Sequence, residues 1–173
     1  MQTLYFLVNS VLSFLVYAFL LRVLLQVARA DFRNPLAQAV VALTNWLVLP
    51  LRKVLPPVGR FDTASLVALV AVQLGAKLIL QRLVLQPMPY GLIVEALRAL
   101  ALATLMLYTI LIFVYAALSF VAPGARSPAT MLLASLCEPL LRPLRRFLPI
   151  VGGIDFSPLV AIVGLTALRI LLS

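Results

Sequence analysis

Long apolar runs constrain the fold of this chain more than any other feature. They cover residues 4–27, 63–85, 92–121 and 156–172, and the last is near the lower limit for crossing a bilayer. Helices and closed barrels are the structures that satisfy their backbone in lipid. Only 11% of residues are charged and 64% are hydrophobic, whereas about a quarter are charged in a soluble domain. We therefore predict an all-α membrane protein with four transmembrane helices.

The second constraint is an internal repeat with an offset of 93 residues. Residues 47–68 match residues 140–161 without a gap, and 12 of the 22 positions are identical. The matches include residue types that are less abundant than Leu here, so their identity carries more weight, namely Pro50/Pro143, Arg52/Arg145, Pro56/Pro149, Gly59/Gly152 and Asp62/Asp155. Such a period indicates duplication. We predict two tandem repeats, 1–86 and 87–173, each with two spans.

The second copy carries the more specific motif. Residues 143–158 read Pro-Leu-Arg-Arg-Phe-Leu-Pro-Ile-Val-Gly-Gly-Ile-Asp-Phe-Ser-Pro, preceded by Cys137-Glu138-Pro139, and residues 29–35 read Arg-Ala-Asp-Phe-Arg-Asn-Pro. These segments resemble the YggT family of small bacterial membrane proteins, in its two-repeat form. The first copy departs from the pattern, with Arg60 in the place of Gly153. The resemblance implies a cell-envelope role in osmotic-stress tolerance or cell division, and in plastid relatives the maturation of a cytochrome complex.

A short amphipathic helix precedes each basic motif. One is expected to start at Pro35, with Asn34 as its N-cap, and the other at Ser127-Pro128. Each should end before Pro50 or Pro143, because proline interrupts helices, and the basic motif should then be extended or kinked. These helices are too short to span and are predicted to lie in the interface or to enter it re-entrantly.

The repeated charged and glycine residues form the candidate site. They are Arg52, Lys53, Asp62, Arg142, Arg145, Arg146, Gly152, Gly153 and Asp155. The basic residues are either a topology signal alone or also a platform for anionic lipid headgroups or an acidic partner. Each aspartate either caps the next helix or pairs with the arginine ten residues earlier.

A polar stripe inside the second span is the candidate pathway. Gln73, Lys77 and Gln81 recur at intervals of four. Ionisable residues within spans are functional by default, but Lys77 could instead reach the interface or pair with Glu95. We expect Arg22, near the end of the first span, to extend its guanidinium to the interface.

Composition excludes several functions. The chain has no histidine and one cysteine, Cys137, so we expect no catalytic, metal or cofactor site and predict that Cys137 is a small buried residue. The net charge of +9 comes mostly from bases beside the spans, so no nucleic-acid partner is expected. By the positive-inside rule both motif loops are cytoplasmic and both termini periplasmic, in the bacterial inner (plasma) membrane.

These features lead to two hypotheses of function. The first is a non-enzymatic scaffold or assembly factor of the inner membrane, which contacts anionic headgroups and other membrane proteins and forms a homo-oligomer. The alternative is an oligomeric ion or small-solute channel or transporter, with the polar stripe as its pathway.

Overall fold

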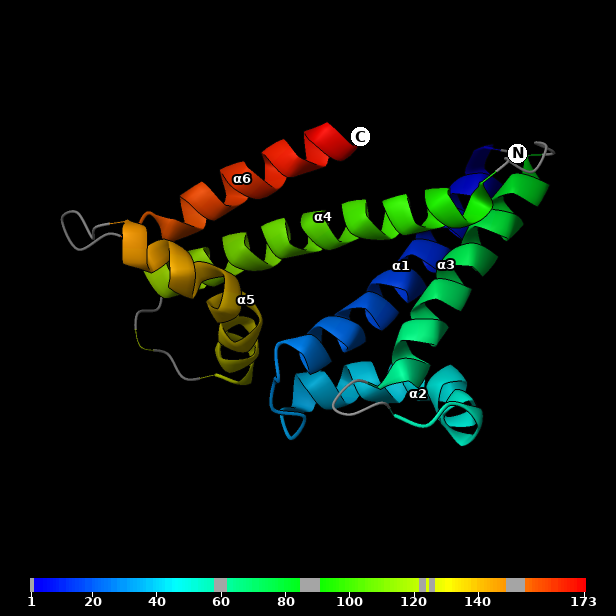
Figure 1. Cartoon of the computed structure of the whole chain (residues 1–173), viewed down its shortest axis with the longest axis horizontal. Coiled ribbons are helices and arrows are strands. Elements are labelled where there is room, and N and C mark those ends of the chain that lie inside the picture. Colours follow the sequence, from blue (N-terminus) through cyan, green and yellow to red (C-terminus); the bar gives the residue numbers. More distant parts are fainter. Residues whose placement is uncertain (1, 58–61, 85–90, 122–123, 125–126, 149–154) are drawn as a thin grey trace. The chain divides into compact units, whose positions relative to one another are not determined.

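The chain is helical throughout the part that the structure describes. This computed structural model describes residues 2–57, 62–84, 91–121, 124, 127–148 and 155–173, and no strand occurs among them. The helices are α1 (Gln2–Val27), α2 (Pro35–Val54), α3 (Thr63–Leu83), α4 (Leu92–Val121), α5 (Pro128–Phe147) and α6 (Ser157–Leu172) (Figure 1). The predicted all-α class is confirmed.

Three of these helices are long and apolar enough to cross a membrane. They are α1, α3 and α4, with 26, 21 and 30 residues. The fourth predicted span, α6, has 16 residues and is shorter than these three. At 1.5 Å per residue, α6 reaches about 24 Å, against a hydrocarbon core of about 30 Å. The fourth span therefore stays a prediction.

The starts of α2 and α5 follow the local rules expected from the sequence. Pro35 opens α2, and the Asn34 side chain accepts a hydrogen bond of 2.9 Å from the Leu36 N–H. Pro128 opens α5, where Ser127 and Thr130 form a capping box. Such caps satisfy N–H groups that have no partner within the helix. Both bounds of α2 and α5 differ by 93, the offset of the sequence repeat.

The ends of these two helices correct the prediction. α2 continues through Pro50 to Val54, and α5 continues through Pro143 to Phe147, so the basic residues lie in the last helical turns. The prediction that each helix ends before Pro50 or Pro143 was wrong, and of the two forms expected for the basic residues, extended or kinked, the extended one does not occur in these helices. An internal proline removes one N–H donor and bends the helix, which exposed turns such as these tolerate. In α2 the helix ends just before the second proline, Pro56, which disfavours helix in the residue preceding it.

The helices form two compact units. Unit 1 contains Met1–Gln26 and Ala39–Ala101, and unit 2 contains Val27–Gln38 and Leu102–Ser173. In unit 1, α2 lies across the ends of α1 and α3, and in unit 2, α5 lies at the ends of α4 and α6 (Figure 1). The division predicted at residues 86 and 87 concerns copies of sequence and stays a prediction.

Buried residues in the two units occupy matching repeat positions. In unit 2, the core contains Ile112, Cys137, Leu141 and Ala161, joined by Leu165. Residues 93 positions earlier are also buried in unit 1, namely Phe19, Thr44, Val48 and Ala68. Each short helix is therefore anchored against its neighbours by the same set of positions. Burial of Cys137 confirms the prediction for that residue.

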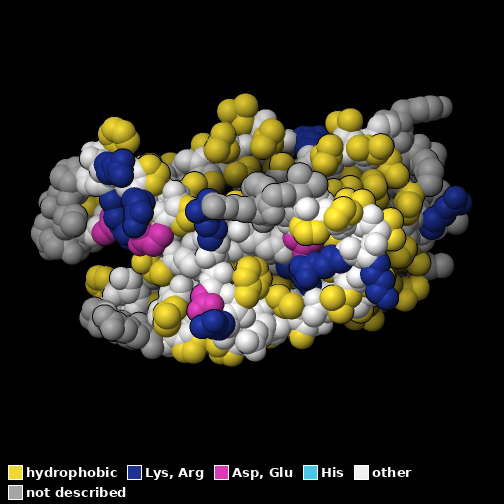
Figure 2. All heavy atoms as spheres, turned by 60° about the horizontal axis from the view of Figure 1, so that its bottom comes forward, with side chains coloured by type: hydrophobic (Ala, Val, Ile, Leu, Met, Phe, Trp, Pro, Cys, Tyr) yellow, Lys and Arg dark blue, Asp and Glu magenta, His cyan; other side chains and the backbone are white. Residues whose placement is uncertain are grey.

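Apolar side chains dominate the outside of the long helices. Phe6, Phe14 and Phe113 are each at least 60% exposed, and only 11% of the most apolar stretch of α4 is buried. Exposed apolar surface of this extent disfavours a soluble state. Figure 2 shows basic and acidic side chains lying together in groups, surrounded by hydrophobic ones. This surface is compatible with a membrane protein.

Candidate functional site

The repeated arginine and aspartate form an ion pair in each unit. In unit 1 the Arg52 Nε lies 3.0 Å from the Asp62 Oδ2, and the Arg52 Nη2 contacts the same oxygen. In unit 2 the Arg145 Nε lies 2.7 Å from the Asp155 Oδ2. The predicted pairing across ten residues is thus confirmed in both copies. Each pair joins the last turn of one helix, α2 or α5, to the start of the next, α3 or α6.

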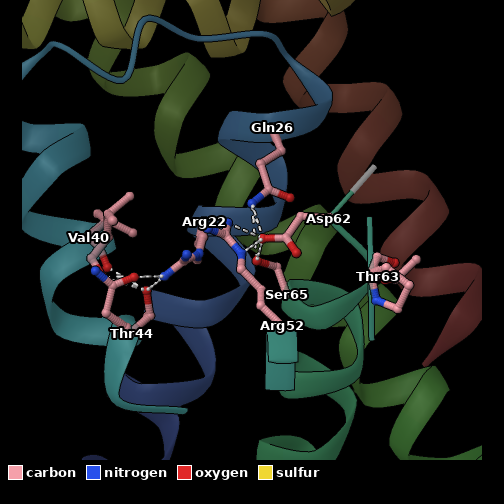
Figure 3. Close-up of polar contacts among 11 residues, drawn as sticks. Arg22, Gln26, Val40, Thr44, Arg52, Asp62, Thr63 and Ser65 are labelled. Carbon is pink, nitrogen blue, oxygen red and sulfur yellow. Dashed lines mark hydrogen bonds and ion pairs between the residues drawn. The ribbon is translucent and has the colours of Figure 1, made fainter. Parts of the chain in front are cut away.

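In unit 1 the aspartate connects three helices. The Asp62 Oδ2 also accepts hydrogen bonds from the Ser65 hydroxyl of α3 (2.7 Å) and from the Gln26 amide of α1 (3.4 Å) (Figure 3). Asp62 occupies the N-cap position of α3, but its side chain accepts no backbone N–H there. Helix capping, the alternative role for this carboxylate, is therefore not what its side chain does in the first copy.

Arg22 of α1 is a buried member of the same cluster. Its side chain donates from Nη1 to the Thr44 hydroxyl (2.7 Å), the Asn45 side-chain oxygen (2.9 Å) and the Val41 carbonyl (3.3 Å), all on α2. Arg22 is 2% exposed. The prediction that its guanidinium reaches the interface was wrong, because α2 folds over it and supplies acceptors. Arg22 therefore anchors α2 to α1.

In unit 2 a single arginine lies between two acids. Arg145 pairs through Nε with Asp155 and through Nη1 with Glu138 at 2.6 Å. The Tyr115 hydroxyl of α4 donates to the same Glu138 carboxylate at 3.2 Å. Asp155 divides its oxygens between two roles, because its Oδ1 accepts the Ser157 N–H at the start of α6 (2.9 Å). In the second copy, capping and pairing coexist.

These contacts keep the cluster charged. Burial alone would raise the carboxyl pKa of Asp62 and of Asp155, but hydrogen bonds and nearby arginines outweigh burial and lower both pKa values. Burial would lower the pKa of Arg145, yet its bonds to Asp155, Glu138 and Tyr115 raise it. The pairs are therefore fully ionised at neutral pH.

The remaining basic residues of the motif point outward. Lys53, Arg142 and Arg146 are exposed, and no described residue forms an ion pair with them. Arg142 and Arg146 are four residues apart, so they share one face of α5. These three side chains are available to anionic groups. Gly152 and Gly153, also predicted as site residues, lie outside the described part of the chain.

The polar stripe on α3 does not carry a free cation. The Lys77 Nζ lies 3.2 Å from a Glu95 carboxylate oxygen on α4. Of the interpretations left open by the sequence, pairing with Glu95 is the one the structure contains. Gln73 is 8% exposed, and the Gln81 Oε1 is buried without a partner among the described residues. A transport role for the stripe stays a prediction.

Several cluster residues, Gln26 among them, were not identified from the sequence as site residues, and four of them carry the comparison of the two copies. These four are Arg22, Asn45, Tyr115 and Glu138. The repeat offset contained a usable signal, because Arg22 and Tyr115 are 93 apart, as are Asn45 and Glu138. The first pair lies on long helices and the second on the short ones. The contact Arg22–Asn45 in unit 1 thus corresponds to Tyr115–Glu138 in unit 2.

The described residues offer no obvious centre for covalent or metal chemistry. No group of three metal-ligating side chains occurs among them. Burial raises the pKa of the Cys137 thiol to about 12, so this thiol is a poor nucleophile at neutral pH. What the clusters can do is bind and hold charged groups at the ends of helices.

Comparison with known proteins gives a consistent result. A family model described as CCB3/YggT matches residues 1–83 and again residues 94–173. A protein of Escherichia coli named "Uncharacterized protein YggT" is 39% identical over 162 residues, which cover 94% of this chain and 85% of that protein. No solved structure matches the chain.

Two further relatives come from other bacteria. An uncharacterized protein of Pseudomonas aeruginosa is 36% identical over 159 residues, with 88% of this chain and 79% of that protein covered. One of Vibrio alginolyticus is 34% identical over 170 residues, with 95% and 90% covered. The matches extend over both motif copies and their ion-paired clusters, and the chain belongs to the CCB3/YggT family.

Proposed function

We propose that this protein is a non-enzymatic scaffold or assembly factor of the bacterial inner membrane, acting with other membrane proteins and as a homo-oligomer. One observation carries the proposal. Arg52 with Asp62 ties α2 to α3 and, through Gln26, to α1. Arg145 with Glu138 and Asp155 ties α5 to the start of α6 and, through Tyr115, to α4. These side chains maintain a shape, while Lys53, Arg142 and Arg146 remain exposed to meet lipid headgroups or an acidic partner.

The orientation that this function requires places both motif loops in the cytoplasm. In that arrangement α6 crosses the membrane and both termini are periplasmic. An alkaline phosphatase fused after Ser173 should then be active, and a reporter that works only in the cytoplasm should be silent. The opposite pattern would contradict both the topology and the fourth span.

The scaffold role is tested with a variant that spares the ion pairs. Arg142→Gln with Arg146→Gln removes the exposed bases of α5, and Arg82→Gln with Arg169→Gln is a matched control outside the motif. We expect all variants to reach the membrane. Only the first variant should lose the proteins that cross-link to and co-purify with the wild type. In a strain that lacks the native copy, only the first variant should fail to restore growth under osmotic stress or normal cell division. Equal behaviour of the two variants would contradict the proposal.

The channel alternative is tested in liposomes. Lys77→Met removes the cation of the stripe and leaves Glu95 without its partner. A flux of ions in wild type that this variant changes would favour transport. We expect the wild type to show no flux above that of empty vesicles in several salts, since the Lys77 charge is compensated by Glu95.

A further inference from the structure

The two clusters carry opposite surplus charge. The first contains two cations, Arg22 and Arg52, and one anion, Asp62. The second contains one cation, Arg145, and two anions, Glu138 and Asp155. The difference arises at two pairs of repeat positions, because Arg22 replaces Tyr115 and Asn45 replaces Glu138. The same local fold thus has one positive charge in excess in unit 1 and one negative charge in excess in unit 2.

The surplus charge of unit 1 is buried and poorly compensated. The bonds of Arg22 all leave from Nη1 and reach neutral acceptors. Its Nε is buried without a partner among the described residues, and water cannot easily supply one, because Arg22 is only 2% exposed. A buried cation is strongly disfavoured without a counter-charge. Asp62 is the nearby anion; its Oδ2 is already used by Arg52, and its Oδ1 is buried without a partner among the described residues.

Donors suited to an anion lie beside this cluster. Arg52 directs Nε and Nη2 to Asp62, which leaves Nη1, and its side chain is 45% exposed. Lys53 follows it and is exposed. The start of α3 adds its positive end, where the Asp62 side chain accepts no backbone N–H. Figure 3 shows Arg22, Arg52 and Asp62 grouped near this start of α3.

We propose that the first cluster is a binding site for a phosphate group, held by Arg52, Lys53 and the start of α3 and drawn by the surplus charge of Arg22. The group is either the headgroup phosphate of an anionic phospholipid or free phosphate. The second cluster is expected to bind phosphate more weakly, because Glu138 supplies the counter-charge that the first cluster lacks. This inference rests on the proposed function in one respect: the headgroup alternative requires that the first cluster lie at the membrane surface.

The decisive variant transfers the second cluster's acid into the first. Asn45→Glu places a carboxylate next to the Arg22 Nη1, which is 2.9 Å from the Asn45 oxygen. It should lower phosphate binding at least about tenfold and also raise the melting temperature, since a charge-assisted bond replaces a neutral one. Loss of binding with gained stability cannot come from unfolding. Asn45→Gln is the neutral control and should bind like the wild type.

Binding is measured on the full chain with two probes. The first is inorganic phosphate, titrated into protein in nanodiscs of phosphatidylcholine. The second is phosphatidylglycerol, whose retention by the detergent-purified protein is compared with that of phosphatidylcholine by native mass spectrometry. Binding of the first alone identifies free phosphate, and preference for the second identifies the headgroup. Either result, when lost in Asn45→Glu, supports the site.

The proposal is overturned if neither probe binds above the phosphatidylcholine background, or if Asn45→Glu binds as the wild type does. Glu138→Gln provides a further check, because it removes an acid without adding a cation to unit 1. Its effect on binding should be less than about twofold. Failure of the scaffold test in cells would leave these binding results unchanged, so the two proposals are separable.

Discussion

The first and second clusters share one ion pair and differ in the charges that surround it. In unit 1, Asp62 gathers donors from α1, α2 and α3, and the charge beside it, Arg22, is buried. In unit 2, Arg145 gathers acceptors, and its partners Glu138 and Asp155 have side chains about one-third exposed. The centre is thus an anion in one copy and a cation in the other. A repeated pair can keep its structural role while its surroundings change sign.

The comparison predicts unequal damage from equivalent substitutions. Asp62→Ala leaves two arginines without an anion, whereas after Asp155→Ala the Arg145 side chain still pairs with Glu138. We expect a loss of unfolding free energy of about 2–3 kcal/mol for the first, since the Asp62 side chain is 11% exposed but Arg52 is 45% exposed, and about 1–2 kcal/mol for the second, for a lost cap and a partly exposed pair. Thermal unfolding in detergent measures both.

Cys137 reports which unit opens. It is the chain's single cysteine, it is fully buried, and its pKa is raised to about 12, so alkylation requires opening of unit 2. Asp155→Ala should speed its alkylation, and Asp62→Ala should not at temperatures below unfolding. Equal speeds in both variants would show that the units open together.

Acid should weaken both clusters over the same pH range. The folded pKa of each aspartate is lowered, so its stabilisation is complete above the ordinary carboxyl pKa of about 4 and is lost as pH falls through the folded value. We expect a constant melting temperature from about pH 7 to pH 5 and a fall below about pH 4. The double variant Asp62→Asn with Asp155→Asn should show a smaller fall.

Replacement by asparagine separates capping from pairing. At position 155 asparagine can still accept the Ser157 N–H, so Asp155→Asn should be about 1 kcal/mol more stable than Asp155→Ala. At position 62 the carboxylate accepts no backbone N–H, so asparagine and alanine should differ less. The reverse order, seen in urea or thermal unfolding, would refute the assigned roles.

Double-mutant cycles test how each pair contributes. Arg145→Ala combined with Asp155→Ala should show coupling of about 1 kcal/mol, and Arg145→Ala combined with Glu138→Ala a similar value, since both acids contact the guanidinium. If the losses of the single variants simply add in each double variant, Arg145 is not energetically coupled to either acid.

The smallest effect is expected outside the clusters. Lys77→Met removes an ion pair whose Glu95 side chain is 48% exposed, so the loss of unfolding free energy should be below about 1 kcal/mol. Glu95→Gln is the matched control. A loss as large as that of Asp62→Ala would show that the Lys77–Glu95 pair stabilises the fold as strongly as the ion pairs of the clusters do.

The sequence was sufficient for the features that depend on local composition. The length of the apolar runs predicted membrane-spanning helices, and α1, α3 and α4 are long and apolar enough to cross a membrane. Asn34 and Ser127 marked helix starts, because a cap acts on the backbone two or three residues away. The ten-residue spacing also located both ion pairs, since in each unit it joins the last turn of one helix to the start of the next.

Tertiary structure decided the features that depend on packing between distant segments. Arg22 contacts acceptors 19 to 23 residues away, and Gln26 meets Asp62 across 36 residues. Such contacts depend on which helix face α2 covers, and the apolar periodicity of a span does not specify that. Pro50 likewise stays helical because the surroundings of α2 tolerate one missing hydrogen bond. The chain thus encodes its membrane class locally, whereas the charge environment of each cluster exists only after α2 and α5 have packed.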